Sequence, residues 1–235
     1  MKNTSMLIAA GIAVAGCSST SAPPPAPVTL RVNVFPGASN LPILVGLDRG
    51  IFAKYGLTIE LQNTPNSDQQ RAGLAKGVFE IAHAAVDNAV AMVEMAKEDV
   101  AIVLGGDGSM NEFYVRPEIR SLADIRGKTL VVDAPNTAYA LVAKKILKNN
   151  GLVEGRDYKL APVGGTPSRI GAMADNPENV AGMLNPPWSF IAQGRGLKAL
   201  GRSIDLFGPY QASGAFVMRK WAAANGDALE RYIAA

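Results

Sequence analysis

Hydrophobic and polar residues alternate strictly over Val28–Val34, which predicts a strand with one buried face. A helix pattern begins at Leu41, and a further strand is predicted over Thr58–Gln62. The continuous apolar run Val100–Leu104 predicts a buried strand. Strands are predicted further along the chain over Phe79–Ala84, Phe113–Arg116, Thr129–Asp133, Tyr158–Pro162, Ala181–Leu184, Lys198–Arg202 and Ala215–Met218. Helices are predicted over Ala138–Asn149 and Trp221–Ala235, the latter with a cap pattern at Asp227 and Glu230, and Ser67 with Gln70 forms a capping-box pattern at the start of another helix. This alternation of strands and helices indicates an α/β fold.

The pattern occurs twice along the chain. A strand, a polar loop and a helix recur in the same order, and equivalent positions are Phe35 and Asp133 (98 apart), Ser67 and Thr166 (99 apart), and Ala84 and Asn185 (101 apart). Two lobes built from βαβ units are therefore predicted. Ligands of open α/β sheets bind at the carboxyl ends of the strands, where helix N-termini converge. Two such edges facing each other would form a cleft.

Composition narrows the classes of function. Of the 235 residues, 48% are hydrophobic and 18% are charged, which suits globular lobes with real cores. The net charge is +3 and the basic residues are scattered, so nucleic acid is not an expected partner. One histidine and one cysteine exclude a His-rich zinc site and an internal disulfide. The histidine, His83, lies beside a predicted cleft loop and is either a hydrogen-bonded core residue or a ligand contact.

The N-terminus has the pattern of an export signal. Lys2 provides the positive charge, and Met6–Ala15 is an apolar run too short to span a bilayer. Val14-Ala15-Gly16-Cys17 resembles a bacterial lipobox, in which the cysteine becomes the lipidated N-terminus. Residues 1–16 are therefore expected to be a lipoprotein signal peptide, and residues 17–27 a Pro- and Ser-rich tether. The mature protein is expected to be periplasmic or at the cell surface, anchored to a bacterial membrane through lipid on Cys17.

Several polar residues stand where predicted helices begin. Asn40, Asn88, Thr137 and Thr166 are at or near such positions, where a side-chain cap contributes about 1 kcal/mol. A helix start that faces a cleft also offers free N–H donors. The loop Asn185-Pro186-Pro187-Trp188 adds two prolines that fix the backbone and an aromatic side chain suited to the wall of a small-molecule site.

The chain resembles the substrate-binding proteins of ABC importers for nitrate, sulfonate, taurine and thiamine precursors. The resemblance is carried by FPGASNLPILVGLDRGIFAKYGLTIEL, LAKGVFEIAHAAVDNAV, VRPEIRSLADIRGKTLVVDAPNTAYAL, PVGGTPSRIGAM and LNPPW, which together span most of the chain after the tether. It implies a two-lobed type 2 periplasmic-binding fold, in which each lobe is a βαβ-based sheet flanked by helices and a cleft lies between the lobes. Residues 28–116, with a return segment over 211–235, would form the first lobe, and residues 117–210 the second.

The resemblance also implies a site and a role. Ligand contacts carried over from the family fall on Ser39, Asn40, Asp87, Asn88, Asn136, Thr137, Gly165, Thr166, Asn185 and Trp188. No catalysis, cofactor or metal is implied. The expected function is delivery of a small organic or oxyanion solute (sulfonate, nitrate or pyrimidine-like) to an ABC permease in the inner membrane, by a monomeric protein.

Two other classes of function fit the same fold. One is an enzyme similar to the thiamine-pyrimidine synthases, which use a histidine and a Cys-rich motif; the chain has one Cys, and the lipobox uses it. The other is a ligand-sensing module that works without a permease. Family members continue for several helices past the position of Ala235, so the chain is also expected to be truncated at its C-terminus and its first lobe to be the less stable one.

Overall fold

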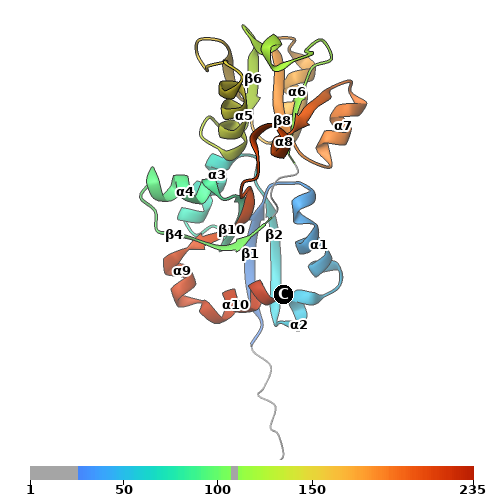
Figure 1. Cartoon of the computed structure of the whole chain (residues 1–235). Helices are drawn as coiled ribbons and strands as arrows, with labels where there is room; N and C mark the ends of the chain where they lie inside the picture. The colour runs from blue at the N-terminus through green and yellow to red at the C-terminus, as the bar shows by residue number, and fades with distance from the viewer. Residues whose placement is uncertain (1–25, 107–110) are drawn as a thin grey trace, which may run out of the picture.

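The computed structural model describes residues 26–106 and 111–235, which form two lobes around two five-stranded sheets. Figure 1 shows the lobes one above the other, with the C-terminus back in the lower, first lobe. The strand orders are β2-β1-β3-β10-β4 and β7-β6-β8-β5-β9. The two orders correspond strand for strand, so the structure confirms the repeated α/β unit predicted from the sequence.

The first sheet contains β1 (Val28–Val34), β2 (Leu57–Asn63), β3 (Ile81–Ala85), β4 (Val100–Gly105) and β10 (Ser213–Met218). Strand β1 is parallel to β2 and β3, whereas β10 runs antiparallel between β3 and β4. The helical elements of this lobe are η1 (Ala38–Asn40), α1 (Leu41–Asp48), α2 (Ile51–Lys54), α3 (Ser67–Ala75), α4 (Asp87–Glu94), α9 (Arg219–Ala224) and α10 (Gly226–Ala234).

Helices cover both faces of the first sheet. On one face, α1, α2 and α10 bring Ile43, Phe52 and Tyr232 against buried strand residues such as Val32. On the other face, α3 and α4 pack around Phe216. The strand predicted from the alternation over Val28–Val34 is therefore confirmed, and its apolar side chains point toward the covering helices.

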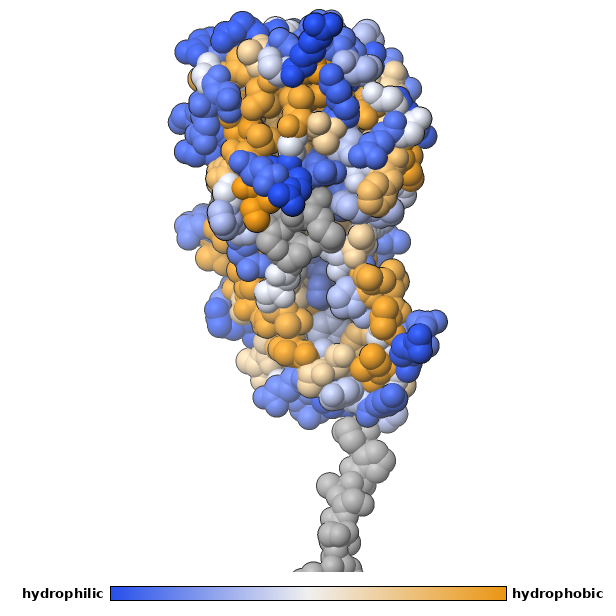
Figure 2. All heavy atoms as spheres, turned by 45° about the vertical axis from the view of Figure 1, so that its right-hand side comes forward, coloured by the Kyte–Doolittle hydropathy of each residue, from blue (hydrophilic) through white to orange (hydrophobic). Residues whose placement is uncertain are grey.

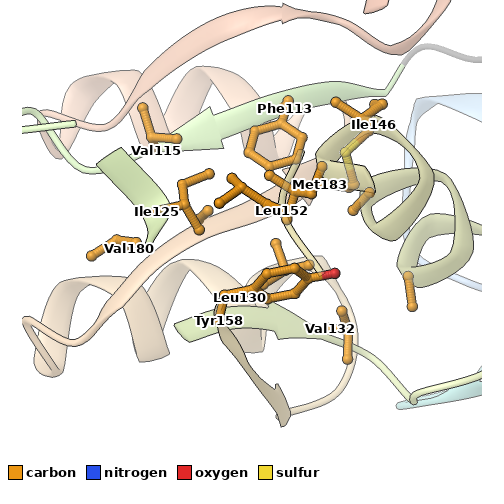
Figure 3. Close-up of a cluster of buried hydrophobic side chains, with 14 of the residues drawn as sticks. Phe113, Val115, Ile125, Leu130, Val132, Ile146, Leu152, Tyr158, Val180 and Met183 are labelled. Carbon is orange, nitrogen blue, oxygen red and sulfur yellow. The ribbon is translucent and has the colours of Figure 1, made fainter. Parts of the chain in front are cut away.

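The second sheet contains β5 (Glu112–Val115), β6 (Thr129–Val132), β7 (Lys159–Pro162), β8 (Asn179–Leu184) and β9 (Lys198–Arg202). Its helical elements are η2 (Leu122–Ile125), α5 (Ala138–Asn149), α6 (Thr166–Asp175), α7 (Trp188–Gly194) and α8 (Ser203–Phe207). Phe113, Leu130, Ile146 and Met183 meet in its larger core cluster, shown in Figure 3. Strand β5 runs antiparallel between β8 and β9, as β10 does between β3 and β4.

Strand β5 lies in the second lobe and not, as expected from the resemblance, in the first. The expected boundary of the first lobe follows residue 116, but β5 hydrogen-bonds within the second sheet. Phe113 and Val115 are fully buried in the second lobe's core, which explains why the strand pairs there. Strands β4 and β5, consecutive along the chain, therefore belong to different lobes.

Two local expectations also differ from the structure. The break in the helical stretch Trp221–Ala235 falls at Asn225, just before the expected cap at Asp227 and Glu230, because the side-chain amide of Asn225 donates to the carbonyl of Trp221 at 2.9 Å and competes with helix continuation. Helix α3 is capped by Asn66, which accepts a hydrogen bond from the backbone of Gln69 at 2.8 Å, and not by Ser67. Ser67 is thereby left for another contact, described below.

The surface carries hydrophobic side chains on one helix of each lobe. On α1, Leu41 is 61% exposed, and on α7, Phe190 is 64% exposed. Both helices lie on the right in Figure 1, the side that Figure 2 turns toward the viewer and where orange side chains appear on both lobes. No helix in residues 26–106 or 111–235 has the length and hydrophobicity to span a membrane.

Candidate functional site

A cavity of about 600 Å³ lies between the two lobes, at the carboxyl ends of their strands. We call it the inter-lobe cavity. Its first-lobe wall comes from the carboxyl ends of β3 and β4, the start of β10 and the segments after β1, β2 and β3, and its second-lobe wall comes from the segments after β6, β7 and β8. The polar residues that line it are Ser39, Asn40, Ser67, His83, Asn88, Asp133, Tyr139, Thr166, Arg169, Asn185 and Ser213. The volume suits an organic molecule of moderate size.

The lobes are closed on each other, and hydrogen bonds join them around the cavity. Three of these use a backbone carbonyl as acceptor, and the fourth joins two side chains. They are Trp188 Nε1 to Pro36 O at 2.8 Å, Ala38 N to Pro186 O at 3.0 Å, Gly165 N to Pro65 O at 3.1 Å, and Ser67 Oγ to Asp133 Oδ2 at 2.7 Å. The approach is close: a Cβ atom on Gly37 would lie 2.9 Å from Asn185 Nδ2.

Asp133 is the buried carboxylate at the centre of the second-lobe wall. It follows β6 and accepts hydrogen bonds from two hydroxyl groups, that of Ser67 in the first lobe and that of Thr137 at the start of α5. The Thr137 hydroxyl also lies 3.0 Å from the carbonyl of Ala134. Thr137 precedes α5 without a side-chain capping bond, so its hydroxyl holds Asp133 in place instead.

Arg169 lines the cavity from α6 and is only 2% exposed. Its guanidinium donates to the carbonyl groups of Met183 at 3.0 Å and Gly164 at 3.1 Å, and to the hydroxyl of Thr166 at 2.8 Å. It also lies 5.9 Å from the ring centre of Tyr139. All these partners are neutral, and no carboxylate of the described residues forms an ion pair with it. Burial lowers the pKa of Arg169 and the charge of Asp133 opposes that change, but an arginine side chain stays charged in proteins.

His83 ends the buried part of β3 and also lines the cavity. Its Nε2 lies 2.8 Å from the hydroxyl of Tyr232 on α10. Burial lowers the pKa of His83 to about 4, so the imidazole is neutral at neutral pH. Tyr232 is buried and stacks on Phe52 with ring centres 5.7 Å apart.

Asp87 begins α4 next to the cavity and does not line it. Both of its carboxylate oxygens are buried, and no side chain of the described residues hydrogen-bonds to them. Burial, with a smaller contribution from the charge of Asp133, raises the pKa of Asp87 to about 7, whereas the backbone N–H groups of Asn88 and Asp87 and the charge of Arg71 oppose this. The neighbouring residue Asn88 lines the cavity and accepts a hydrogen bond from Arg71 at 3.2 Å.

The residues predicted from the sequence fall into groups. Six of them line the inter-lobe cavity: Ser39, Asn40, Asn88, Gly165, Thr166 and Asn185. Thr137 acts on Asp133, and Trp188 joins the lobes through Pro36. Asn136 lies apart, in a second cavity of about 570 Å³ beside α3 and α4. Cys17, with the proposed signal peptide and most of the tether, lies outside the described residues.

Among the polar residues that line the cavity outside the ten contacts carried over from the family are Ser67, Asp133 and Arg169. The sequence signal for Asp133 was its place after β6, equivalent to the loop after β1. Arg169 carried only the weak signal of standing next to a second-lobe loop. Ser67 had a competing interpretation as a helix cap. In the part of the chain that the structure describes, no three His, Cys, Asp or Glu side chains gather as a metal site would require.

Comparisons with known proteins agree with this architecture. The model of the NMT1-like family matches residues 22–235, and no curated protein matches the chain. The alkanesulfonate-binding protein SsuA from Xanthomonas axonopodis pv. citri, bound to MOPS, is similar with a TM-score of 0.71 and 18% identity, over 89% of this chain and 71% of that one. The periplasmic nitrate-binding protein NrtA from Synechocystis PCC 6803 has a TM-score of 0.75 and 14% identity, over 87% and 59%. The periplasmic aliphatic sulphonate-binding protein SsuA from Escherichia coli has a TM-score of 0.68 and 18% identity, over 89% and 71%. At these identities the likeness establishes the fold.

Proposed function

The chain belongs to the NMT1-like family, and on this premise we propose that it is an extracytoplasmic solute-binding protein that delivers a small organic anion to an ABC importer. A two-lobed fold with one cavity wall on each lobe is suited to enclosing a solute and releasing it when the lobes separate. Structural neighbours with the same fold are named as binding proteins for sulfonate and nitrate. The proposal places the solute in the inter-lobe cavity.

The assignment of an anionic ligand rests on the environment of Arg169. A buried charge is costly unless an opposite charge compensates it. Arg169 has only neutral hydrogen-bond partners and lines the cavity. The negative charge of Asp133 acts on Arg169 without forming an ion pair with it, whereas an anionic group bound beside the guanidinium would bring an opposite charge into direct contact. Asp133 is a poorer partner for the ligand because both of its oxygens already accept hydrogen bonds from hydroxyl groups.

The apolar part of the cavity supports an organic ligand over an inorganic ion. The first-lobe wall of the cavity faces the lobe that carries Arg169, and it is lined by the apolar side chains of Phe35, Leu41, Ile43 and Leu104. A nitrate ion would occupy a small fraction of about 600 Å³ and would leave these side chains without contacts. A sulfonate with a short carbon chain would use both the arginine and the apolar wall.

Catalysis is not part of the proposal. The cavity contains one histidine, which is held by Tyr232, and no described cluster of metal-ligating side chains. The Cys-rich motif of the thiamine-pyrimidine synthases would need more than the single cysteine of this chain. We therefore assign the site to binding, with an ABC permease as the partner that receives the solute.

Membrane attachment through Cys17 is proposed from the sequence of the export signal. Replacing Cys17 with Ser should give protein that is soluble or unprocessed in the producing bacterium. Cell fractionation with immunoblotting measures this. Cleavage at the same position with unchanged membrane association in Cys17→Ser would contradict lipidation.

The ligand proposal is tested by thermal unfolding of the purified protein with hexanesulfonate, hexylamine, nitrate or a hydroxymethylpyrimidine. A ligand at about 100 times its Kd stabilises the folded state by about 2.7 kcal/mol. We expect hexanesulfonate to raise the melting temperature and hexylamine, which has the same carbon chain and the opposite charge, to leave it unchanged. Stabilisation by hexylamine or the pyrimidine without stabilisation by hexanesulfonate would overturn the organic-anion assignment.

A further inference from the structure

Helix α10 contacts the binding site through the hydrogen bond between Tyr232 and His83. His83 lines the inter-lobe cavity, whereas Tyr232 lies behind it in the core of the first lobe. The two residues are 149 positions apart in the chain. Residues Ile81 and His83 point to the same face of β3, because side chains alternate along a strand, and this is the face that α10 covers.

The direction of this hydrogen bond follows from the surroundings of Tyr232. The tyrosine is 4% exposed, and its hydroxyl has no partner other than His83 Nε2 among the described residues. A buried hydroxyl hydrogen needs an acceptor. If Nε2 carried the imidazole proton, the hydroxyl hydrogen would have none. The hydroxyl therefore donates, and Nε2 is the unprotonated nitrogen.

The protonation state of the ring then follows. Burial lowers the pKa of His83 to about 4, so the ring carries one proton at neutral pH. With Nε2 bare, this proton is on Nδ1. No described residue hydrogen-bonds to Nδ1, so this N–H remains for a molecule in the cavity. Burial also raises the pKa of Tyr232, which keeps its hydroxyl protonated as the donor.

We propose that Tyr232 is a positioning residue that holds His83 in the tautomer with its proton on Nδ1, so that the ring donates a hydrogen bond to the anionic group of the bound solute. At this point the cavity therefore favours ligands that have a hydrogen-bond acceptor. A ligand with only a donor there would meet the Nδ1–H donor of His83. The inference rests on the proposed function for the identity of the ligand, but the tautomer itself is independent of it.

The tautomer is measured by NMR on protein labelled with 15N-histidine, without any ligand. Because His83 is the only histidine, a mature protein without a tag contributes one imidazole. We expect two-bond couplings to identify Nδ1 as protonated and Nε2 as bare, with no titration from about pH 8 to about pH 5.5. In Tyr232→Phe, which keeps the aromatic ring on Phe52, we expect the Nε2–H form to appear. A wild-type ring protonated on Nε2, or an unchanged spectrum in Tyr232→Phe, would overturn the proposal.

Binding of hexanesulfonate separates this role from simple packing. Asparagine can place an amide N–H near the position of Nδ1, whereas glutamine reaches the position of Nε2. We expect His83→Gln to weaken binding by about 10- to 150-fold, the effect of losing a hydrogen bond to a charged group, and His83→Asn to retain more affinity. The matched control is Tyr158→Phe, a buried tyrosine of the second lobe, which should change neither the spectrum nor the affinity.

The two proposals fail in different ways. If no sulfonate binds but the spectrum shows the expected tautomer and its loss in Tyr232→Phe, the ligand assignment is wrong and the role of Tyr232 stands. If hexanesulfonate binds but His83→Gln and His83→Leu bind it as tightly as the wild type, His83 does not contact the solute and the selectivity inference is wrong.

Discussion

The indole Nε1 of Trp188 donates a hydrogen bond to the backbone carbonyl of Pro36 at 2.8 Å, and this bond joins the two lobes beside the inter-lobe cavity, which Pro36 lines. The partners are 152 residues apart in the chain. Pro36 follows β1 in the first lobe, and Trp188 begins α7 in the second. The bond can therefore form only when the two lobes are in contact.

Replacing Trp188 with Phe should weaken ligand binding by favouring the open state. The variant keeps an aromatic side chain and loses the N–H, which costs about 0.5–1.5 kcal/mol, or about 2- to 12-fold in affinity. Isothermal titration with hexanesulfonate measures the affinity, and small-angle X-ray scattering measures the opening. Trp221→Phe, at the only other tryptophan, is the control. An equal loss of affinity in both variants would show that the hydrogen bond of Trp188 does not favour the closed state.

Replacing Arg169 with Met should abolish the preference for anions. The loss of a charged hydrogen-bond donor costs about 1.5–3 kcal/mol, or about 10- to 150-fold in affinity for hexanesulfonate. Titration measures this, with unfolding curves to confirm that the variant is folded. Arg195→Met, at an exposed arginine of the same lobe, should bind normally. Tight sulfonate binding by Arg169→Met would place the anion elsewhere in the cavity.

Replacing Gly37 with Ala should hinder closure of the lobes. Its Cβ would lie 2.9 Å from Asn185 Nδ2, and Asn185 is held by Thr166 through a 2.6 Å hydrogen bond. Scattering should therefore show a larger radius of gyration in the presence of ligand than for the wild type. At Gly194 a Cβ would meet no atom within 4 Å, so Gly194→Ala should close normally. A Gly37→Ala protein that closes as fully as the wild type would show that Asn185 can move aside.

Stability should fall as the pH rises through the range in which Asp87 ionises. Burial and the charge of Asp133 raise the pKa of Asp87 from its ordinary value of 3.8 to about 7. Between these values the folded protein holds a proton that the unfolded chain has released, so the free energy of unfolding decreases as the pH rises and levels off above about pH 7. Asp87→Asn should remove this contribution and be more stable relative to the wild type at pH 8 than at pH 4.

Denaturant unfolding at several pH values measures the effect of Asp87. The control is Asp48→Asn, at an exposed carboxylate of α1. The same pH dependence in the wild type and in Asp87→Asn would mean that another group is responsible.

Much of the architecture could be predicted from the sequence, because it is written in local patterns. Alternation predicted β1, and helix α5 has the predicted bounds Ala138–Asn149. The repeat predicted two equivalent lobes, and the observed strand orders correspond. The placement of β5 could not be predicted in the same way, because a short apolar strand fits either sheet and only the core around Phe113 decides.

The site was less visible in the sequence, because its key contacts cross between the lobes. Ser67 pairs with Asp133 across 66 residues, and each would have a plausible local role alone. Arginine is usually a surface residue, but Arg169 is buried. Its guanidinium donates hydrogen bonds to backbone carbonyls, which no sequence pattern reveals. The hydrogen bond of His83 to Tyr232 depends on α10 packing under β3, which follows from the fold and not from either segment.

The position of β10 between β3 and β4 has a consequence for how the protein is made. The last strand of the first sheet leaves the ribosome after the whole second lobe, so the nascent first lobe has a gap in its sheet while more than a hundred further residues are synthesised. Domains generally fold from the N-terminus as synthesis proceeds, but this one must wait for a distant segment, and long-range pairing is slow. A first lobe that stays incomplete until β10 has been synthesised also stays unfolded longer. For a protein with the proposed export signal, that delay would keep the polypeptide unfolded and therefore able to pass through a translocation channel.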